Sequence, residues 1–159
     1  MKRRTKILLA MLAVAAAMFL LTRFVVKPFV VVGESMSPTL RSWDLCLMQR
    51  VYQYQPRRGD IVMFRTADDP PVYFIKRVIA LPGERVAVHC GAVQLNGAPM
   101  PEPYTTANSD WEFTVTNVPP GRVFAMGDNR AEGGMETWRG FVATRLVIGR
   151  LIWHGRWKS

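Results

Sequence analysis

The chain has 159 residues, of which 49% are hydrophobic, and its 21 Lys and Arg against 12 Asp and Glu leave a formal net charge of +9. This length suits one domain with a core of modest size, and the high apolar content with 12 Gly and 11 Pro argues against disorder and against a helical bundle. The first 27 residues hold six Lys and Arg and no acid, whereas the rest of the chain carries 15 basic and 12 acidic side chains. Because a nucleic-acid-binding protein concentrates positive charge on its folded domain, we expect no nucleic-acid partner.

The amino end is expected to be a membrane segment. A basic cluster at residues 2–6 precedes the apolar run Ile7 to Leu21. Counting on to Val26, with the stem of Arg23 in the apolar layer, gives enough helix to cross a hydrocarbon core of ~30 Å. Basic residues before the segment and a long domain after it predict a single-pass protein of the plasma (inner) membrane, with its amino end in the cytoplasm. Residues 1–27 then form the basic end and anchor, and residues 28–159 form an extracytoplasmic domain.

A cleavable signal peptide is the alternative explanation of the same segment. Ala13-Val14-Ala15 has the small-x-small spacing of a cleavage site. Cleavage there would leave Met18-Phe19-Leu20-Leu21 on a soluble product, so we favour the uncleaved anchor.

The remainder of the chain predicts a mainly β domain, because short apolar runs alternate with turn signals. Asn96-Gly97 predicts a type I′ hairpin turn, and Pro82-Gly83 supplies the middle pair of a type II turn. So many short strands in about 130 residues suggest a strongly bent sheet or barrel. The expected strands are Val30–Val32, Leu45–Met48, Ile61–Phe64, Tyr73–Ala80, Val86–Val88, Val93–Leu95, Glu112–Thr116 and Val123–Met126.

The two cysteines and two histidines show no metal-ligand spacing. Cys46 and Cys90 fit a disulfide in an oxidising compartment and equally fit free thiols. His89 and His154 are single and far apart in the sequence, so we expect no metal site.

The candidate chemistry begins at Ser35, in the segment Gly33-Glu34-Ser35-Met36-Ser37-Pro38-Thr39-Leu40. A glycine before a serine allows a sharp bend that exposes the hydroxyl and leaves the serine N–H facing a developing oxyanion. Taken alone, Ser35 and Ser37 are explained more simply as turn residues that hydrogen-bond their own backbone.

Lys76 is the candidate base for this serine. Neither histidine lies in a triad context, and no Gly-x-Ser-x-Gly elbow occurs. A lysine can accept a proton when burial keeps it neutral, and Lys158, the other lysine after the anchor, stands next to the carboxyl terminus.

The neighbours of Lys76 predict a buried amine. Alternation along the expected strand places Lys76 on one face with Phe74, Val78 and Ala80. An amine among such side chains is desolvated, which favours its neutral form. The alternative is a lysine on a solvated edge strand, where it guards against edge pairing.

Four ordered segments resemble those of the bacterial type I signal peptidases, membrane-bound proteases that use a Ser–Lys dyad. The similarity extends from the anchor to near residue 150. The segments are Gly33 to Leu40, then Gly59-Asp60-Ile61-Val62-Met63-Phe64, then Tyr73 to Glu84, and finally Gly127-Asp128-Asn129-Arg130 followed by Gly140-Phe141-Val142.

The resemblance implies a serine endopeptidase that removes signal peptides from exported preproteins and needs no cofactor or metal. Its partners would be the signal peptides of secreted preproteins and membrane lipid. The implied fold is a coiled antiparallel β-sheet protease domain behind one N-terminal transmembrane helix. By the same resemblance, Ser35 is the nucleophile and Lys76 the general base, with Gly33 and Met36 at oxyanion and substrate positions and Arg77, Asp128, Asn129 and Arg130 bracing the site.

The sequence departs from the family pattern in two places. Gly33 stands where some members have a serine whose hydroxyl assists the oxyanion hole. After Arg130 the family usually has a Ser-x-Asp-Ser-Arg run, and the corresponding positions of its lysine-orienting serine and its ion pair are Gly133, Met135 and Thr137. Thr137, Glu132 and Glu136 are the candidates to compensate; without compensation the activity would be weakened.

Three other functions remain open. A specialised processing peptidase would share both catalytic residues and cleave one partner protein. A non-catalytic descendant that binds signal peptides is suggested by the altered region Gly133–Thr137. A basic module binding anionic lipid is the third, because no acid follows Glu136 while Arg145, Arg150, Arg156 and Lys158 do.

Overall fold

The computed structural model describes residues 3–105, 109–131 and 140–155, and it is mainly β, as expected. All strand pairs are antiparallel. The elements are α1 (Arg3–Leu20), a π-helical turn (Leu21–Val25), β1 (Val26–Val30), β2 (Leu45–Arg50), β3 (Ile61–Arg65), β4 (Tyr73–Ala80), β5 (Arg85–His89), β6 (Ala92–Leu95), β7 (Ala98–Pro99), β8 (Phe113–Asn117), β9 (Arg122–Met126), β10 (Gly140–Ala143), a 3₁₀ turn (Thr144–Leu146) and β11 (Val147–Gly155).

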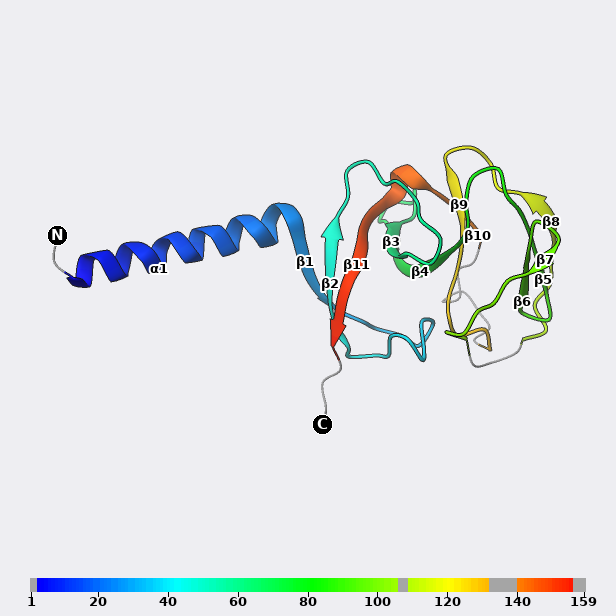
Figure 1. The fold of residues 1–159 in the computed structure, drawn as a ribbon, viewed down its shortest axis with the longest axis horizontal. Coiled ribbons are helices and arrows are strands. Elements are labelled where there is room, and N and C mark those ends of the chain that lie inside the picture. Colours follow the sequence, from blue (N-terminus) through cyan, green and yellow to red (C-terminus); the bar gives the residue numbers. More distant parts are fainter. Residues whose placement is uncertain (1–2, 106–108, 132–139, 156–159) are drawn as a thin grey trace.

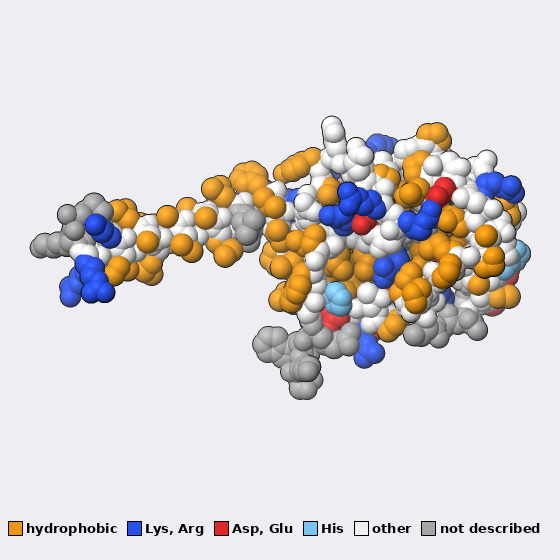
Figure 2. Space-filling view, in the orientation of Figure 1, with side chains coloured by type: hydrophobic (Ala, Val, Ile, Leu, Met, Phe, Trp, Pro, Cys, Tyr) orange, Lys and Arg blue, Asp and Glu red, His pale blue; other side chains and the backbone are white. Residues whose placement is uncertain are grey.

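The amino-terminal helix is apolar on every side, and none of its residues from Arg3 to Leu20 is buried in the domain. It projects away from the strands, with apolar side chains along its length and Lys and Arg side chains at its amino end (Figures 1 and 2). The segment Arg3–Val25 has a mean hydropathy of 2.3 in its most apolar stretch, and none of that stretch is buried. It is therefore a candidate membrane span by length and composition. An all-round apolar surface is typical of a helix surrounded by lipid.

The helical segment ends one residue earlier than the sequence suggests. Val26 is the first residue of β1 rather than the last of the helix, and the strand expected at Val30–Val32 lies at Val26–Val30. Pro28 fits inside this strand because β1 is at the edge of its sheet, where a missing N–H breaks no ladder.

A seven-stranded sheet in the order β1-β2-β11-β3-β4-β9-β10 forms the larger part of the domain. It carries two apolar clusters. Val62, Val78 and Ala125 belong to the cluster on the central strands. Val31, Met36 and Leu40 belong to the cluster beside β1 and β2, which therefore includes the turn that follows β1.

The four-stranded sheet β7-β6-β5-β8 makes a second, smaller layer on the far side of β9 from the helix (Figure 1). The Asn96-Gly97 hairpin is confirmed: both residues have positive φ, +53° and +85°, between the paired Leu95 and Ala98. The turn at Pro82-Gly83 is confirmed as well, with Gly83 at φ +85° and a hydrogen bond from Glu84 N to Leu81 O.

An aromatic group joins the two sheets. Phe124 on β9 is fully buried and lies 4.9 Å, centroid to centroid, from Phe113 on β8. Trp111 and Phe141 pack around the same ring at 6.5 and 5.6 Å. Such contacts hold β9, a strand of the large sheet, against the small sheet.

Three strands, the two-residue β7 and the longer β10 and β11, were not among those expected from the sequence. β11 lies in the middle of the large sheet, between β2 and β3, although its local pattern is interrupted by Gly149 and Arg150. Gly149 has a packing reason, since a Cβ there would lie 2.4 Å from Met48 Cγ. A bulge between Leu151 and Trp153 also breaks the alternation that a sequence pattern requires.

The cysteines are free thiols, so of the two alternatives the disulfide is not formed. Cys46 is buried and Cys90 is exposed. Burial, with a smaller contribution from the charge of Asp44, raises the pKa of the Cys46 thiol to about 11. Cys46 therefore acts as a small apolar core residue.

Phe124→Ala tests the junction of the two sheets. We expect a loss of about 3–5 kcal/mol in the free energy of unfolding, because the substitution leaves a cavity among packed aromatic rings. Urea denaturation followed by tryptophan fluorescence measures it. Tyr52→Ala is the control: Tyr52 is exposed, so its loss should stay below about 0.5 kcal/mol. Equal losses in the two variants would contradict the role of Phe124.

Candidate active site

The Ser35 turn follows β1 and is held by its own backbone and by Ser42. Gly33 has φ +97°, a conformation that glycine adopts readily. Its N–H donates to Ser42 Oγ at 2.9 Å, and the Ser42 hydroxyl lies 3.3 Å from the Gly33 carbonyl oxygen. Ser37 N–H donates to Glu34 O at 2.9 Å, which closes a turn around Ser35. Buried Met36 anchors this turn in the core.

Lys76 is buried in the middle of the large sheet, with a relative exposure of 1%. It lies opposite Val62 on β3, and its strand β4 is flanked on the other side by β9. The solvated-edge alternative is therefore wrong. The expected alternation is also wrong in one detail: a bulge between Val78 and Ala80 places Ala80 with Ile79 in a different cluster from Val78.

Gly127 is where the Ser35 turn and Lys76 meet. A Cβ atom on Gly127 would lie 2.2 Å from the Ser35 carbonyl oxygen and 3.5 Å from Lys76 Nζ. The first distance is far inside van der Waals contact, so only a glycine permits this approach. The backbone of the serine and the amine of the lysine thus border the same small volume.

The loop that follows β9 also fixes the Ser35 backbone by hydrogen bonds. Asn129 N–H donates to Ser35 O at 3.1 Å, and the Asn129 side-chain amide donates to Glu34 O at 3.2 Å. These bonds orient the peptide groups on both sides of Ser35, and the one that contains the Glu34 carbonyl also carries the Ser35 N–H. Asn129 therefore fixes the backbone of the candidate nucleophile through two hydrogen bonds.

A buried ion pair ties this loop to β4 and to the Ser35 turn. Arg77 donates to Asp128 through Nε at 2.8 Å and Nη2 at 2.6 Å, and the Thr39 hydroxyl donates to the same carboxylate at 2.6 Å. Arg77 Nη1 also donates to Gly59 O at 3.0 Å. Burial opposes the charge of Arg77, but the hydrogen bonds and charge of Asp128 outweigh it and raise the pKa of the guanidinium.

Arg130 is buried as well, and its partner was not found from the sequence. Its Nε donates to Gly127 O at 3.1 Å, and its two terminal nitrogens donate to the Glu102 carboxylate. Tyr104 lies next to both arginines, with its ring 4.1 Å from the centre of the Arg77 guanidinium and its hydroxyl donating to Glu102 at 2.8 Å. Sequence reasoning missed Glu102 and Tyr104 because nothing in their local pattern marks contacts with residues so far along the chain.

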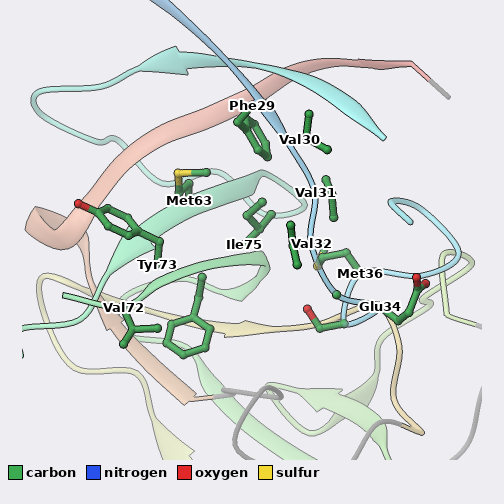
Figure 3. Close-up of a pocket in the computed structure, with 13 residues that line it drawn as sticks. Phe29, Val30, Val31, Val32, Glu34, Met36, Met63, Val72, Tyr73 and Ile75 are labelled. Atoms are coloured by element: carbon green, nitrogen blue, oxygen red, sulfur yellow. The ribbon is translucent and has the colours of Figure 1, made fainter. Parts of the chain in front are cut away.

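An apolar cleft of about 430 Å³ opens beside Ser35 (Figure 3). The segment around Val30–Val32 forms one wall and the start of β4, from Val72 to Ile75, the other. Gly33, Ser35 and Met36 line the cleft. The arrangement suits an extended apolar peptide whose backbone passes the Ser35 hydroxyl.

Several residues singled out in the sequence lie outside the described part of the chain: Glu132, Gly133, Met135, Glu136, Thr137, Arg156 and Lys158. Arg150, one of the basic residues of the lipid-binding alternative, is on β11, and its Nη1 lies 3.7 Å from Asp60 Oδ1, so it forms an ion pair within the domain. Within the described ranges, no group of three His, Cys, Asp or Glu side chains could hold a metal ion.

Residues 4–154 match the family described as signal peptidase, peptidase S26. The match covers almost the whole chain, including the helix, the Ser35 turn, β4 and the loop after β9. The chain therefore belongs to this family of serine peptidases, which confirms the resemblance seen in the sequence.

Individual relatives carry the same description. The chain is 36% identical over 138 residues to signal peptidase I of Leptolyngbya laminosa, covering 81% of this chain and 68% of that protein. It is 34% identical over 144 residues to signal peptidase I of Bacillus caldolyticus, with 80% and 78% covered. The signal peptidase I of Bacillus amyloliquefaciens is 32% identical over 150 residues, with 86% and 77% covered.

Gly127→Ala tests the close approach of the Ser35 carbonyl. The added methyl group would force the Ser35 backbone away, and a displacement of about 1 Å can lower a catalysed rate ~100-fold. We expect that loss in the rate of preprotein cleavage. Gly121→Ala is the control, because a Cβ there meets nothing within 4 Å, so only its φ of +70° disfavours the change. Unaltered cleavage by Gly127→Ala would contradict the geometry.

Proposed function

We propose that this protein removes signal peptides from exported preproteins, with Ser35 as the nucleophile and Lys76 as the general base. The observation that supports this most directly is the meeting at Gly127 of the Ser35 turn and the buried lysine, beside an apolar cleft. Membership of the S26 family, whose named relatives are signal peptidases, supports the substrate class.

The reaction proceeds in two halves. The neutral amine of Lys76, favoured by burial, removes the proton of Ser35 Oγ as the oxygen attacks the scissile carbonyl. The Ser35 N–H, oriented by the bonds from Asn129, stabilises the oxyanion, an effect worth about 3–4 kcal/mol per donor in serine proteases. Protonated Lys76 donates to the leaving amine, and water repeats the cycle to release the acyl group.

The cleft determines which peptides reach the serine. Its walls are apolar over Val31, Met36 and Ile75, and it is open at one side. An extended peptide with small apolar side chains fits such a surface, as expected of the segment that precedes a signal-peptide cleavage site. Glu34 places one carboxylate at the rim, close to the serine.

We also propose that the helix is an uncleaved anchor and that the domain lies outside the cytoplasm, on the surface of the same membrane. Val30 and Leu45 pair across β1 and β2, so they share a face, and both are exposed. Trp153 on β11 is exposed beside them, with its ring over Gly155, the partner of Leu45. The helix leads into β1, which pairs with β2, so these side chains would lie close to the membrane surface. Aromatic side chains are enriched at that level, among the lipid headgroups.

Trp43 adds to the support for this membrane contact. It is 76% exposed and has φ +74°, a conformation that a bulky side chain rarely adopts. The backbone N–H of Trp43 donates to Val31 O at 2.9 Å. Trp43 therefore lies at the end of the exposed apolar face and close to the cleft that Val31 lines. An exposed indole is typical of the interface of a bilayer.

The dyad is tested with the purified full-length protein in detergent and a preprotein carrying an Ala-x-Ala site. Ser35→Ala and Lys76→Met should each abolish cleavage, the first by removing the nucleophile and the second by removing the base while keeping an apolar stem. Circular dichroism should show both variants folded. Ser37→Ala, in the same turn, is the matched control and should retain cleavage. Processing at near the unsubstituted rate by either dyad variant would contradict the assignment.

The topology is tested on intact cells or spheroplasts. Protein purified from membranes should begin at or near Met1 and retain the apolar segment through Leu21. Protease added from outside should digest the domain, because the basic residues at 2–6 keep the amino end inside. A soluble product beginning near Ala16 or Met18 would show that the signal-peptide alternative is correct.

A further inference from the structure

The short segment Glu102–Tyr104, which follows β7, contacts both arginines of the site, the buried Arg130 and the partly buried Arg77. The Glu102 and Arg130 side chains are only 7% and 3% exposed. Glu102 also contacts the small sheet, because the Val93 N–H on β6 donates to Glu102 Oε2 at 3.4 Å. The segment therefore connects the small sheet to the arginines.

Tyr104 links the two guanidinium groups through one side chain. Its ring faces Arg77, the partner of Asp128, and its hydroxyl donates to Glu102, the partner of Arg130. Burial first, and then the charge of Glu102, raise the pKa of Tyr104, so the phenol keeps its proton and remains a donor. The charge of Glu102 also acts on Arg77, where it helps to hold the guanidinium in its charged form.

Arg130 connects Glu102 to the glycine that borders Ser35 and Lys76. Its Nη1 donates at 2.5 Å to Gly91 O, in the turn between β5 and β6, while its Nε donates to Gly127 O at 3.1 Å. Gly127 in turn borders both the Ser35 carbonyl and Lys76 Nζ. A shift of Arg130 would thus move the glycine that separates nucleophile and base.

We infer that Glu102 and Tyr104 are positioning residues for the Ser35–Lys76 pair, acting through Arg130, Arg77 and the loop Gly127–Arg130. This inference rests on the proposed function of that pair. Neither residue lines the cleft, so they determine the alignment of the reacting groups and not the binding of the peptide. Loss of alignment lowers kcat, whereas KM depends on the cleft.

Tyr104→Phe is the most selective test, because it keeps the ring against Arg77 and removes only the hydrogen bond to Glu102. We expect kcat for preprotein cleavage to fall ~5- to 10-fold with KM unchanged, the size of effect that the loss of one ordinary hydrogen bond has. Glu102→Gln should lower kcat further, since it also removes the charge opposite Arg130.

Glu112→Gln is the matched control. Glu112 pairs with His89 on the same small sheet, but both side chains are more than half exposed and neither contacts the loop. Its kcat should equal that of the unsubstituted protein. The double variant Tyr104→Phe with Glu102→Gln should be no slower than Glu102→Gln alone, because the tyrosine acts on the loop through the carboxylate.

Amide hydrogen exchange at Asn129 gives a second readout that does not depend on turnover. The Asn129 N–H donates to Ser35 O, so it should exchange faster in Tyr104→Phe while the amides of β3 stay unchanged. A higher KM with unchanged kcat, or lower stability with unchanged kcat and unchanged Asn129 exchange, would overturn the inference. If the unsubstituted protein does not cleave preprotein, the proposed function fails, and the exchange at Asn129 still decides whether the segment positions the loop.

Discussion

The buried ion pair between Arg77 and Asp128 is the contact on which the geometry of the site depends. Arg77 is the residue after Lys76 on β4, and Asp128 is the residue after Gly127 in the loop that follows β9. Thr39 brings the Ser35 turn to the same carboxylate. One carboxylate thus holds together three segments that are far apart in the sequence, each next to a residue of the proposed catalytic pair or to the glycine between them.

Ion pairs of this kind contribute more to geometry than to stability. Removing two charges from water is costly, and a well-packed apolar pair of similar volume often stabilises a protein as much or more. A fork of two hydrogen bonds between a guanidinium and a carboxylate, however, defines direction as well as distance. Apolar contacts alone would let the loop shift, and the proposed Ser35–Lys76 pair would lose activity after a displacement of about 1 Å.

The apolar contacts of the small sheet complement this network. Phe124 and Met126 on β9 belong to the apolar cluster formed with β5, β6 and β8. These contacts hold the end of β9 in place, directly before the loop that begins at Gly127. On the other side, β1 passes directly from the helical segment to the wall of the cleft, with Val31, Val32 and Gly33 lining it. A peptide whose apolar part lies in the bilayer would therefore approach the cleft from the side of the membrane that the proposed topology assigns to the domain.

The local features of this protein were readable from the sequence because their causes are local. A long unbroken apolar run predicts a helix, a period of two predicts strands, and Asn96-Gly97 or Pro82-Gly83 favours a single kind of turn. Seven strands were located in this way, an eighth was expected four residues after its actual start, and the four ordered segments pointed to the S26 family. The tertiary structure decided what depends on distant partners. Gly149 and Arg150 interrupt the apolar alternation of β11, so its sequence does not predict a strand. Pairing with β2 and β3 nevertheless makes it a central strand. The bulge in β4 moves Ala80 away from Val78. Glu102 and Tyr104 became visible only once folding brought them to Arg130 and Arg77, because a buried charge is satisfied by whichever side chain the fold brings near it, and no sequence spacing encodes that meeting.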